Sequence, residues 1–208
     1  PTGLLIHDTL SARIHPRRAC AALARAITAK GGEITIEGAL SGKVIHATGV
    51  AGLEELTTPS HKMAVVGVKG QSALLDVSAP GMPQIFADEI HIIPHEDGTT
   101  AIGSTSEREF AHPTSTDELL DEVIERAMRA APVLRGAKVI ERWAGLRPRA
   151  RARTPVLGAH PIHEGQFIAN GGFKIGFGVA PKVGQVIADL MLDGADTIPA
   201  KFRPEAAL

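Results

Sequence analysis

Two stretches decide the fold of this sequence: Trp143-Ala-Gly-Leu-Arg-Pro148 and the glycine-rich run Asn170-Gly-Gly-Phe-Lys-Ile-Gly-Phe-Gly-Val-Ala-Pro181. Arg147 sits between a tryptophan and a proline, and its planar guanidinium is suited to binding a carboxylate. The glycine-rich run leads into a periodic apolar segment, which predicts a turn at a helix N-terminus, a favourable place for an anionic or electron-rich ligand. The arginines between positions 142 and 153 could instead form an exposed basic run or bind phosphate, and the residues alone leave that alternative open.

The composition describes a globular chain without a dominant charge. The 208 residues are 44% hydrophobic, and 22 Lys and Arg balance 23 Asp and Glu, so we expect a real core and no nucleic-acid partner. No apolar run approaches the ~20 residues needed to span a bilayer, so we expect no membrane span. Cys20 is the single cysteine; this favours a cytoplasmic location, and the alanines around it predict a buried thiol.

The N-terminal part predicts a helix followed by two strands. Pro16 suits a first helical turn, Leu23 and Ile27 lie on one stripe, and Gly31-Gly32 is a stop signal, so we expect a helix over 16–30. Glu33–Glu37 and Lys43–Thr48 are then expected to be strands. This order is typical of a parallel α/β layer.

The middle of the chain predicts an antiparallel meander. We expect strands at 63–68, 84–93 and 99–105, with a hairpin turn at Asp97-Gly98. Ser115-x-x-Glu118 has the pattern of a capping box and predicts a helix that stops at Pro132. A further strand is expected over 138–143.

The last helix has the strongest periodicity in the chain. Five apolar residues follow helical spacing: Val183, Val186, Ile187, Leu190 and Met191. We expect this helix to begin with Pro181 at its first position and to end at Gly194.

Several segments, in this order, resemble the D-amino-acid oxidase/glycine oxidase family of FAD-dependent oxidoreductases. They are His15–Arg18, Val44–Gly49, Gly67–Gln71, Ile92–Gly98, Ile102–Glu107, Trp143–Pro148, Pro155–Gly158 and Gly171–Pro181. Each segment alone is a weak indicator of the family, and their shared order makes the resemblance specific. The family's G-x-G-x-x-G motif for the FAD pyrophosphate does not occur in this sequence, so these residues are expected to supply only part of a flavin site.

The resemblance implies a fold of the α/β (α+β) class. It places a partial FAD-binding segment at 1–60, a substrate-binding domain with an antiparallel or mixed sheet and a helix at 61–147, and a return to a Rossmann-like FAD-binding domain at 148–208. It also implies oxidation of the C–N bond of a small amino acid or amine by hydride transfer to flavin. The alternative is a non-catalytic or truncated ligand-binding remnant of the same fold.

The resemblance also assigns site residues. Arg147 would bind the substrate carboxylate, with Lys174 and His91 beside it, and no side chain would act as a catalytic base. The residues expected to contact FAD are Thr48, Gly49, Gly145, Gly171, Gly172, Phe173, Lys174, Ile175 and Gly176. Whether oxygen or another acceptor reoxidises the flavin stays open, as does assembly into a homo-oligomer.

The histidines do not predict a metal site. His91 and His95 are four residues apart, which separates them by about 13 Å along a strand. His160 and His163 could converge in a turn, but no cysteine or acidic pair near them in the sequence completes a ligand set. We therefore expect no metal.

Overall fold

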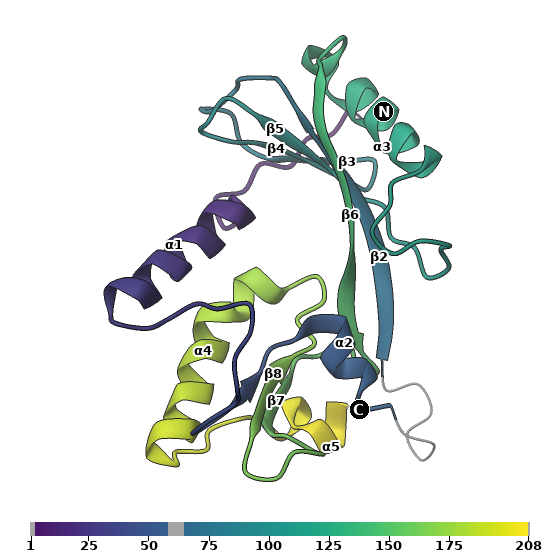
Figure 1. Ribbon diagram of the computed structural model, residues 1–208. Coiled ribbons are helices and arrows are strands. Elements are labelled where there is room, and N and C mark those ends of the chain that lie inside the picture. Colours follow the sequence, from purple (N-terminus) through teal and green to yellow (C-terminus); the bar gives the residue numbers. More distant parts are fainter. Residues whose placement is uncertain (1–2, 58–64, 208) are drawn as a thin grey trace.

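The computed structural model describes residues 3–57 and 65–207 and contains two β-sheets (Figure 1). One has five strands in the order β3-β4-β5-β2-β6, and the other has three in the order β1-β8-β7. The elements are α1 (Pro16–Ala29), β1 (Ile45–His46), α2 (Gly49–Glu54), β2 (Val65–Leu75), β3 (Ile85–Ala87), β4 (Ile90–Pro94), β5 (Thr100–Gly103), α3 (Glu118–Ala130), η1 (Pro132–Leu134), β6 (Val139–Ala150), β7 (Val156–Ala159), β8 (Phe167–Asn170), α4 (Gly176–Asp193), η2 (Ala200–Phe202) and α5 (Pro204–Ala207). The predicted α/β (α+β) class is confirmed.

The five-stranded sheet is antiparallel, and its longest pairing joins β2 to β6, from Val65 opposite Ala150 to Leu75 opposite Val139. The hairpin predicted at Asp97-Gly98 joins β4 to β5, and Gly98 has the positive φ of 85° that favours glycine there. The strand predicted at 63–68 begins partly outside the described residues, and β2 continues to Leu75.

Helix α3 covers one face of this sheet. Its apolar stripe packs against alternate residues of the strands, and the buried cluster includes Ile90, Ile92, Ile102, Leu120, Val123, Ile124 and Ala127. The predicted capping box at Ser115 is wrong. The N-cap is Asp117, whose carboxylate accepts a hydrogen bond from the Leu119 N–H. Aspartate caps as well as serine does, and Gln71 and Lys69 hold this one in place.

The three-stranded sheet combines segments from both ends of the chain. β1 pairs with β8 in parallel and β7 pairs with β8 antiparallel. A cluster of Leu53, Leu56, Ala150, Val156 and Ile168 joins α2 to this sheet and to the end of β6. Helix α4 packs on the sheet through Val186 and Ile187, against Leu157 and Ile198.

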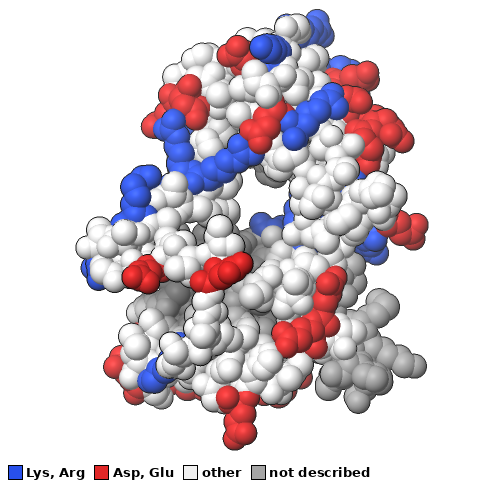
Figure 2. Space-filling model, viewed as in Figure 1, with Lys and Arg blue, Asp and Glu red and all other residues white. Residues whose placement is uncertain are grey.

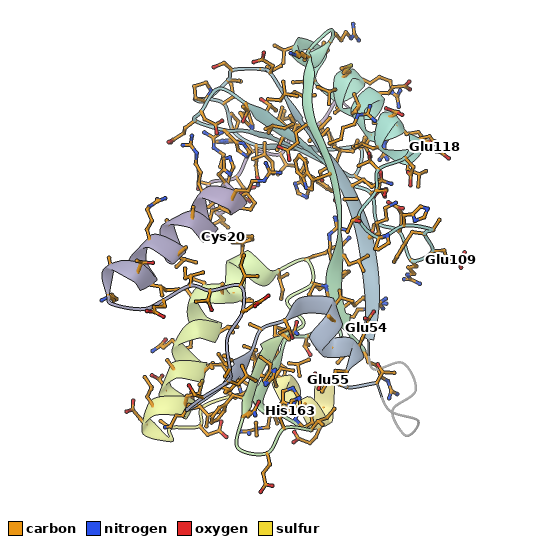
Figure 3. All side chains as sticks on the ribbon, in the orientation of Figure 1. Cys20, Glu54, Glu55, Glu109, Glu118 and His163 are labelled. Carbon is orange, nitrogen blue, oxygen red and sulfur yellow. The ribbon has the colours of Figure 1, made fainter. Side chains whose placement is uncertain are left out.

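Helix α1 forms where expected, but it lacks the expected packing. None of its residues is buried, Leu23 and Ile27 are 63% and 49% exposed, and the Cys20 thiol is exposed rather than buried (Figure 3). The strand predicted at Glu33–Glu37 is also wrong, since the structure has only bends there. A helix makes its hydrogen bonds within its own segment, whereas a strand needs a partner that the described residues do not supply.

Helix α4 begins five residues earlier than predicted. Pro181 lies inside it rather than at its first position, and the first turn starts at Gly176. The predicted end is confirmed, because Gly194 adopts the left-handed conformation with φ of 70°. Among residues 3–57 and 65–207, no helix combines the length and apolar character that crossing a membrane requires.

We expect Leu120→Ala to lower the free energy of unfolding by about 2–5 kcal/mol, because the fully buried side chain leaves a cavity under the sheet. The neighbouring Leu119→Ala is the matched control: Leu119 is 38% exposed, so its loss should cost much less. Urea denaturation followed by circular dichroism measures both. Equal losses would contradict the assignment of α3 as the cover of this core.

Candidate active site

A cavity of about 830 Å³ lies between α3, the five-stranded sheet and the loop after β8. His91 of β4, Arg147 of β6 and Lys174 of the loop all line it. The three residues predicted to bind substrate are therefore brought together, although they are far apart in the sequence. Figure 2 shows an opening through the centre of one face of the molecule, with Lys and Arg side chains gathered along its upper rim.

Arg147 is held in place by oxygen atoms of neighbouring strands and loops. Its Nη1 donates to the backbone oxygens of Lys69 and Thr105, each at 3.3 Å, and its Nη2 donates to Ser104 Oγ at 2.5 Å. A guanidinium has five N–H donors. Nε–H and one N–H of Nη2 therefore have no partner among the described residues. Two free donors on a fixed fork are what a bidentate carboxylate requires.

Gly70 makes room for this guanidinium. It lies opposite Gly145 in the β2–β6 ladder, two positions from the pair formed by Val68 and Arg147. A Cβ on Gly70 would lie 2.1–2.4 Å from the guanidinium atoms of Arg147, whereas a Cβ on Gly145 would meet nothing within 4 Å. The sequence offers glycines at both positions, but only the register of the ladder shows which one matters for Arg147.

Lys174 and His91 are two further polar residues of the cavity lining. The Lys174 ammonium is exposed and lies 5.7 Å from the centre of the Phe173 ring. Burial lowers the pKa of His91, and the positive charge of Lys174 lowers it further. Both effects favour the neutral imidazole. The positive charges of Arg147 and Lys174 share the cavity lining with Arg126 and with the carboxylates of Glu89, Glu107 and Glu122.

The predicted cofactor residues gather mainly in two adjoining turns. Thr48 and Gly49 follow β1, and Gly171 follows β8, its parallel neighbour. Gly49 and Gly171 have positive φ angles of 64° and 73°. Asn170 joins the turns: its Nδ2 donates to Gly49 O at 2.9 Å, and its Oδ1 accepts from Gly171 N–H at 2.8 Å. The carboxyl ends of parallel strands are where α/β proteins bind nucleotide cofactors.

The second turn runs directly into α4. A Cβ on Gly172 would lie 2.9 Å from Gly176 Cα, so only glycine fits this close approach. The N-cap residue, Ile175, offers no side-chain cap to the first-turn N–H groups, and Phe173 N–H donates to Pro148 O at 3.1 Å. Bare backbone donors beside a glycine turn suit an electron-rich ring edge. Gly145 lies apart from these turns, on β6.

A buried ionic cluster adjoins the residues that hold Arg147, and no sequence pattern predicts it. Lys69 is 1% exposed, and its Nζ lies 2.9 Å from Asp117 Oδ2 and 3.3 Å from Glu107 Oε2. Gln71 Nε2 donates to the same two carboxylates. These contacts hold the segment 104–117 against β2, and both sides contribute oxygens to Arg147. Lys69 and Gln71 lie beyond the strand predicted at 63–68, and only the longer β2 places them on one face of the sheet.

The cluster predicts an acid-sensitive fold. Hydrogen bonds from Gln71, then from Lys69, hold the pKa of Asp117 below its usual value. A depressed folded-state pKa gives stability that is present above about pH 4 and is lost as the pH falls through the folded pKa. We therefore expect the difference in free energy of unfolding between the wild type and Asp117→Asn to be largest near neutral pH and to shrink below pH 4.

Urea titrations at a series of pH values measure this difference. The exposed Glu109 (Figure 3) provides the control, because Glu109→Gln should leave the pH profile nearly unchanged. A wild-type–Asp117→Asn difference that stays constant from pH 7 to pH 3 would refute the role of this carboxylate.

Comparison with known proteins agrees with this geometry. Residues 2–190 match the family model described as FAD dependent oxidoreductase. Glycine oxidase from Pseudomonas putida is 34% identical over 178 residues, which make up 84% of this chain and 48% of that relative. The chain spans about half the length of the curated relatives it matches.

Solved structures show the same similarity. Glycine oxidase from Bacillus cereus matches with a TM-score of 0.65 at 26% identity, over 74% of this chain and 43% of that one. Iminodiacetate oxidase from Chelativorans sp. BNC1 shares the fold, with a TM-score of 0.76 at 22% identity, over 90% of this chain and 58% of that one. Because the family model matches nearly the whole chain, the protein belongs to the D-amino-acid oxidase family of FAD-dependent oxidoreductases.

Proposed function

We propose that this chain supplies the carboxylate-binding side of an FAD-dependent enzyme that oxidises the C–N bond of a small amino acid or amine. The observation that carries the proposal is the state of Arg147: three oxygen contacts fix its guanidinium, two of its N–H donors have no partner among the described residues, and the residue lines the cavity. Relatives named glycine oxidase support a small amino acid as substrate. We also propose a cytoplasmic location, consistent with the single cysteine.

The residues of the chain would bind and orient the substrate. Arg147 would take the carboxylate through a bidentate pair, and Lys174 would add a second positive charge at the same cavity. Holding the carboxylate fixes the direction of the bond to be broken, and such positioning alone can account for a large share of a rate enhancement. Neutral His91 can accept a hydrogen bond from the substrate amine.

The cofactor would lie against the two glycine turns. FAD, when bound, supplies the hydride acceptor. Gly49 and Gly171 hold the turns in conformations that side chains disfavour, and Gly176 leaves the start of α4 without bulk. The N-terminal dipole of α4 would stabilise negative charge at this edge of the ring. The set fits a flavin ring edge; in this family the pyrophosphate is held by a separate G-x-G-x-x-G turn.

We expect Arg147→Met to lower kcat/KM in the flavin-loaded protein by about a hundredfold or more, because two charge-assisted hydrogen bonds to the carboxylate are lost. Arg151→Met is the control: its side chain is exposed in the turn after β6 and should matter little. Anaerobic flavin reduction by glycine and by N-methylglycine, followed at the flavin absorbance, measures both. Equal effects of the two substitutions would favour a general anion-binding run and contradict carboxylate binding by Arg147 alone.

We expect Gly70→Ala, on strand β2, to disturb the position of the Arg147 guanidinium on the neighbouring strand β6. The added methyl would overlap the guanidinium of Arg147 and push it away from its three acceptors. This should lower kcat/KM about 10–100-fold, the effect of losing one charged hydrogen bond. Gly81→Ala, where a Cβ meets nothing within 4 Å, is the matched control. Unchanged kinetics for Gly70→Ala, with the fold intact by circular dichroism, would show that Arg147 does not need this space.

A further inference from the structure

A second cavity, of about 490 Å³, lies on the face of the five-stranded sheet opposite α3. This volume is typical of small-molecule sites. Residues 14–17, at the start of α1, form one wall. The strand residues that line it alternate with Ala73, Leu75 and Ile92, which face the core under α3. They include Ser72, Leu74, Ile93, Ala101 and Trp143.

The floor of this cavity is apolar although it is not part of the core. Ala101 lies at its centre, because its cross-strand neighbours are Ile93 on β4 and Leu74 on β2. These three side chains and that of Trp143 are only partly buried. When one face of an antiparallel sheet packs on a core, the other face is usually polar and solvated. Apolar side chains on this second face are therefore typical of a surface that binds an apolar group.

The first turn of α1 is attached to the sheet and forms the wall of the cavity. The His15 ring stacks on that of His95, with the ring centres 4.2 Å apart. The guanidinium of Arg17 lies 5.2 Å from the centre of the Trp143 ring, and its Nη1 donates to Glu141 Oε2 at 2.6 Å. These contacts hold the helix start beside the sheet and leave the cavity between them as a preformed space.

The apolar cavity adjoins the cavity that contains Arg147. His91 and Ser104 line both of them, and Ser104 Oγ accepts from Arg147 Nη2 at 2.5 Å. The guanidinium lies where a side chain on Gly70 would be. Ser72 of the apolar cavity is two residues farther along the same side of β2, about 7 Å away. A carboxylate held by Arg147 would therefore lie within a few carbon atoms of the apolar cavity.

We propose that this cavity binds the side chain of the substrate, and that the substrate is an amino acid with an apolar side chain of several carbon atoms rather than glycine. The inference rests on the proposed function, because Arg147 must hold the carboxylate for the side chain to reach the cavity. Each methylene that leaves water for an apolar site strengthens binding about three- to fourfold. Glycine has no group to place there and would leave the cavity to water.

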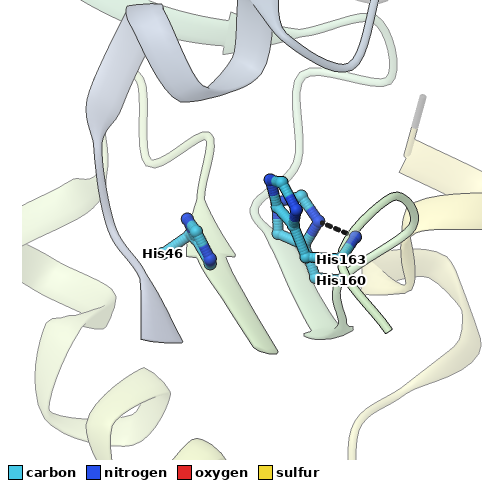
Figure 4. Close-up of side chains that lie close together, drawn as sticks. All are labelled: His46, His160 and His163. Carbon is cyan, nitrogen blue, oxygen red and sulfur yellow. Dashed lines mark hydrogen bonds between the residues drawn. The ribbon is translucent and has the colours of Figure 1, made fainter. Parts of the chain in front are cut away.

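Three histidines beside the three-stranded sheet form another group that the proposed function does not use, but they do not fit a metal ion (Figure 4). His160 Nδ1 accepts from the backbone N–H groups of Ile162 at 3.2 Å and His163 at 3.1 Å, which leaves Nε2 as a protonated donor. The rings of His46 and His163 are stacked, with an angle of 15° between their planes, and are not aimed at a common point.

The test is a fluorescence titration of the 208-residue chain with butanoate and hexanoate. Trp143 is the only tryptophan and the sequence has no tyrosine, so the emission reports on the apolar cavity. Acetate, which has no group for the cavity, is measured by its competition with hexanoate. We expect the affinity to rise about three- to fourfold with each added methylene. The emission should shift to shorter wavelength as the hydrocarbon chain displaces water from the indole.

Two substitutions separate the apolar cavity from the carboxylate site. Ala101→Leu should fill the floor of the cavity, weaken hexanoate binding more than tenfold and leave acetate binding unchanged. Ala130→Leu is the matched control, because Ala130 is exposed at the end of α3, on the other side of the sheet. Arg147→Met should weaken the binding of all three carboxylates. Circular dichroism checks that each variant is folded, and the comparison of acetate with hexanoate in the wild type does not depend on any variant.

The outcomes distinguish a failure of this inference from a failure of the proposed function. Affinities that do not rise with chain length, although Arg147→Met abolishes binding, would overturn the apolar cavity and leave the proposed function standing. Equal affinities of the wild type and Arg147→Met, or no binding of any carboxylate, would contradict both. If riboflavin quenches Trp143 and displaces hexanoate, a flavin ring occupies the cavity, and the assignment to a substrate side chain is wrong.

Discussion

The antiparallel pairing of β2 with β6 is the constraint on which the rest of the structure depends. Its register sets Gly70 opposite Gly145 and Val68 opposite Arg147, so the guanidinium occupies the space that a side chain at Gly70 would fill. The same pairing places Lys69 O within reach of Arg147. A slip of one residue would turn Arg147 to the other face of the sheet. The carboxylate site is thus a property of the ladder as much as of the arginine.

The structure also depends on a buried cluster in which opposite charges are paired. Lys69 would be costly to bury alone, but Glu107 and Asp117 surround its ammonium, and Gln71 satisfies the remaining carboxylate oxygens. Asp117 is also the N-cap of α3. The helix that closes the core of the five-stranded sheet therefore starts at the residue that anchors the loop behind Arg147, so the stability of α3 and the geometry of the site have a common origin.

Local signals in the sequence predicted the elements that depend on local chemistry. Gly98 and Gly194 need positive φ, and both appear where the pattern places them; the apolar stripe of α3 is buried as expected. The predictions that proved wrong concern elements whose structure depends on tertiary contacts. Leu23, Ile27 and Cys20 stay exposed on α1, and Glu33–Glu37 pairs with no strand among residues 3–57 and 65–207. Pro181 predicts a helix start, whereas α4 begins five residues earlier, at Gly176.

The residues of the candidate site also divide into those that short motifs identify and those that only the fold identifies. Arg147, Lys174 and His91 could be chosen from sequence because their motifs resemble those of a known family, whereas the roles of Gly70 and Asp117 follow only from the fold. His46 and Glu55 are likewise distant in sequence from His160 and His163, and only the fold brings them together. Short-range patterns identify single residues, and tertiary pairing assembles them.

One backbone hydrogen bond has a mechanical consequence. Phe173 N–H donates to Pro148 O, so the turn before α4 is fastened one residue from Arg147. The end of β6 is also embedded in the cluster around the three-stranded sheet, through Ala150. Arg147 and the glycine turn are therefore linked through a few residues of one strand and one backbone hydrogen bond. This short connection fixes the spacing between a carboxylate held at Arg147 and a ring held at the turn, which limits the length of ligand that can reach both.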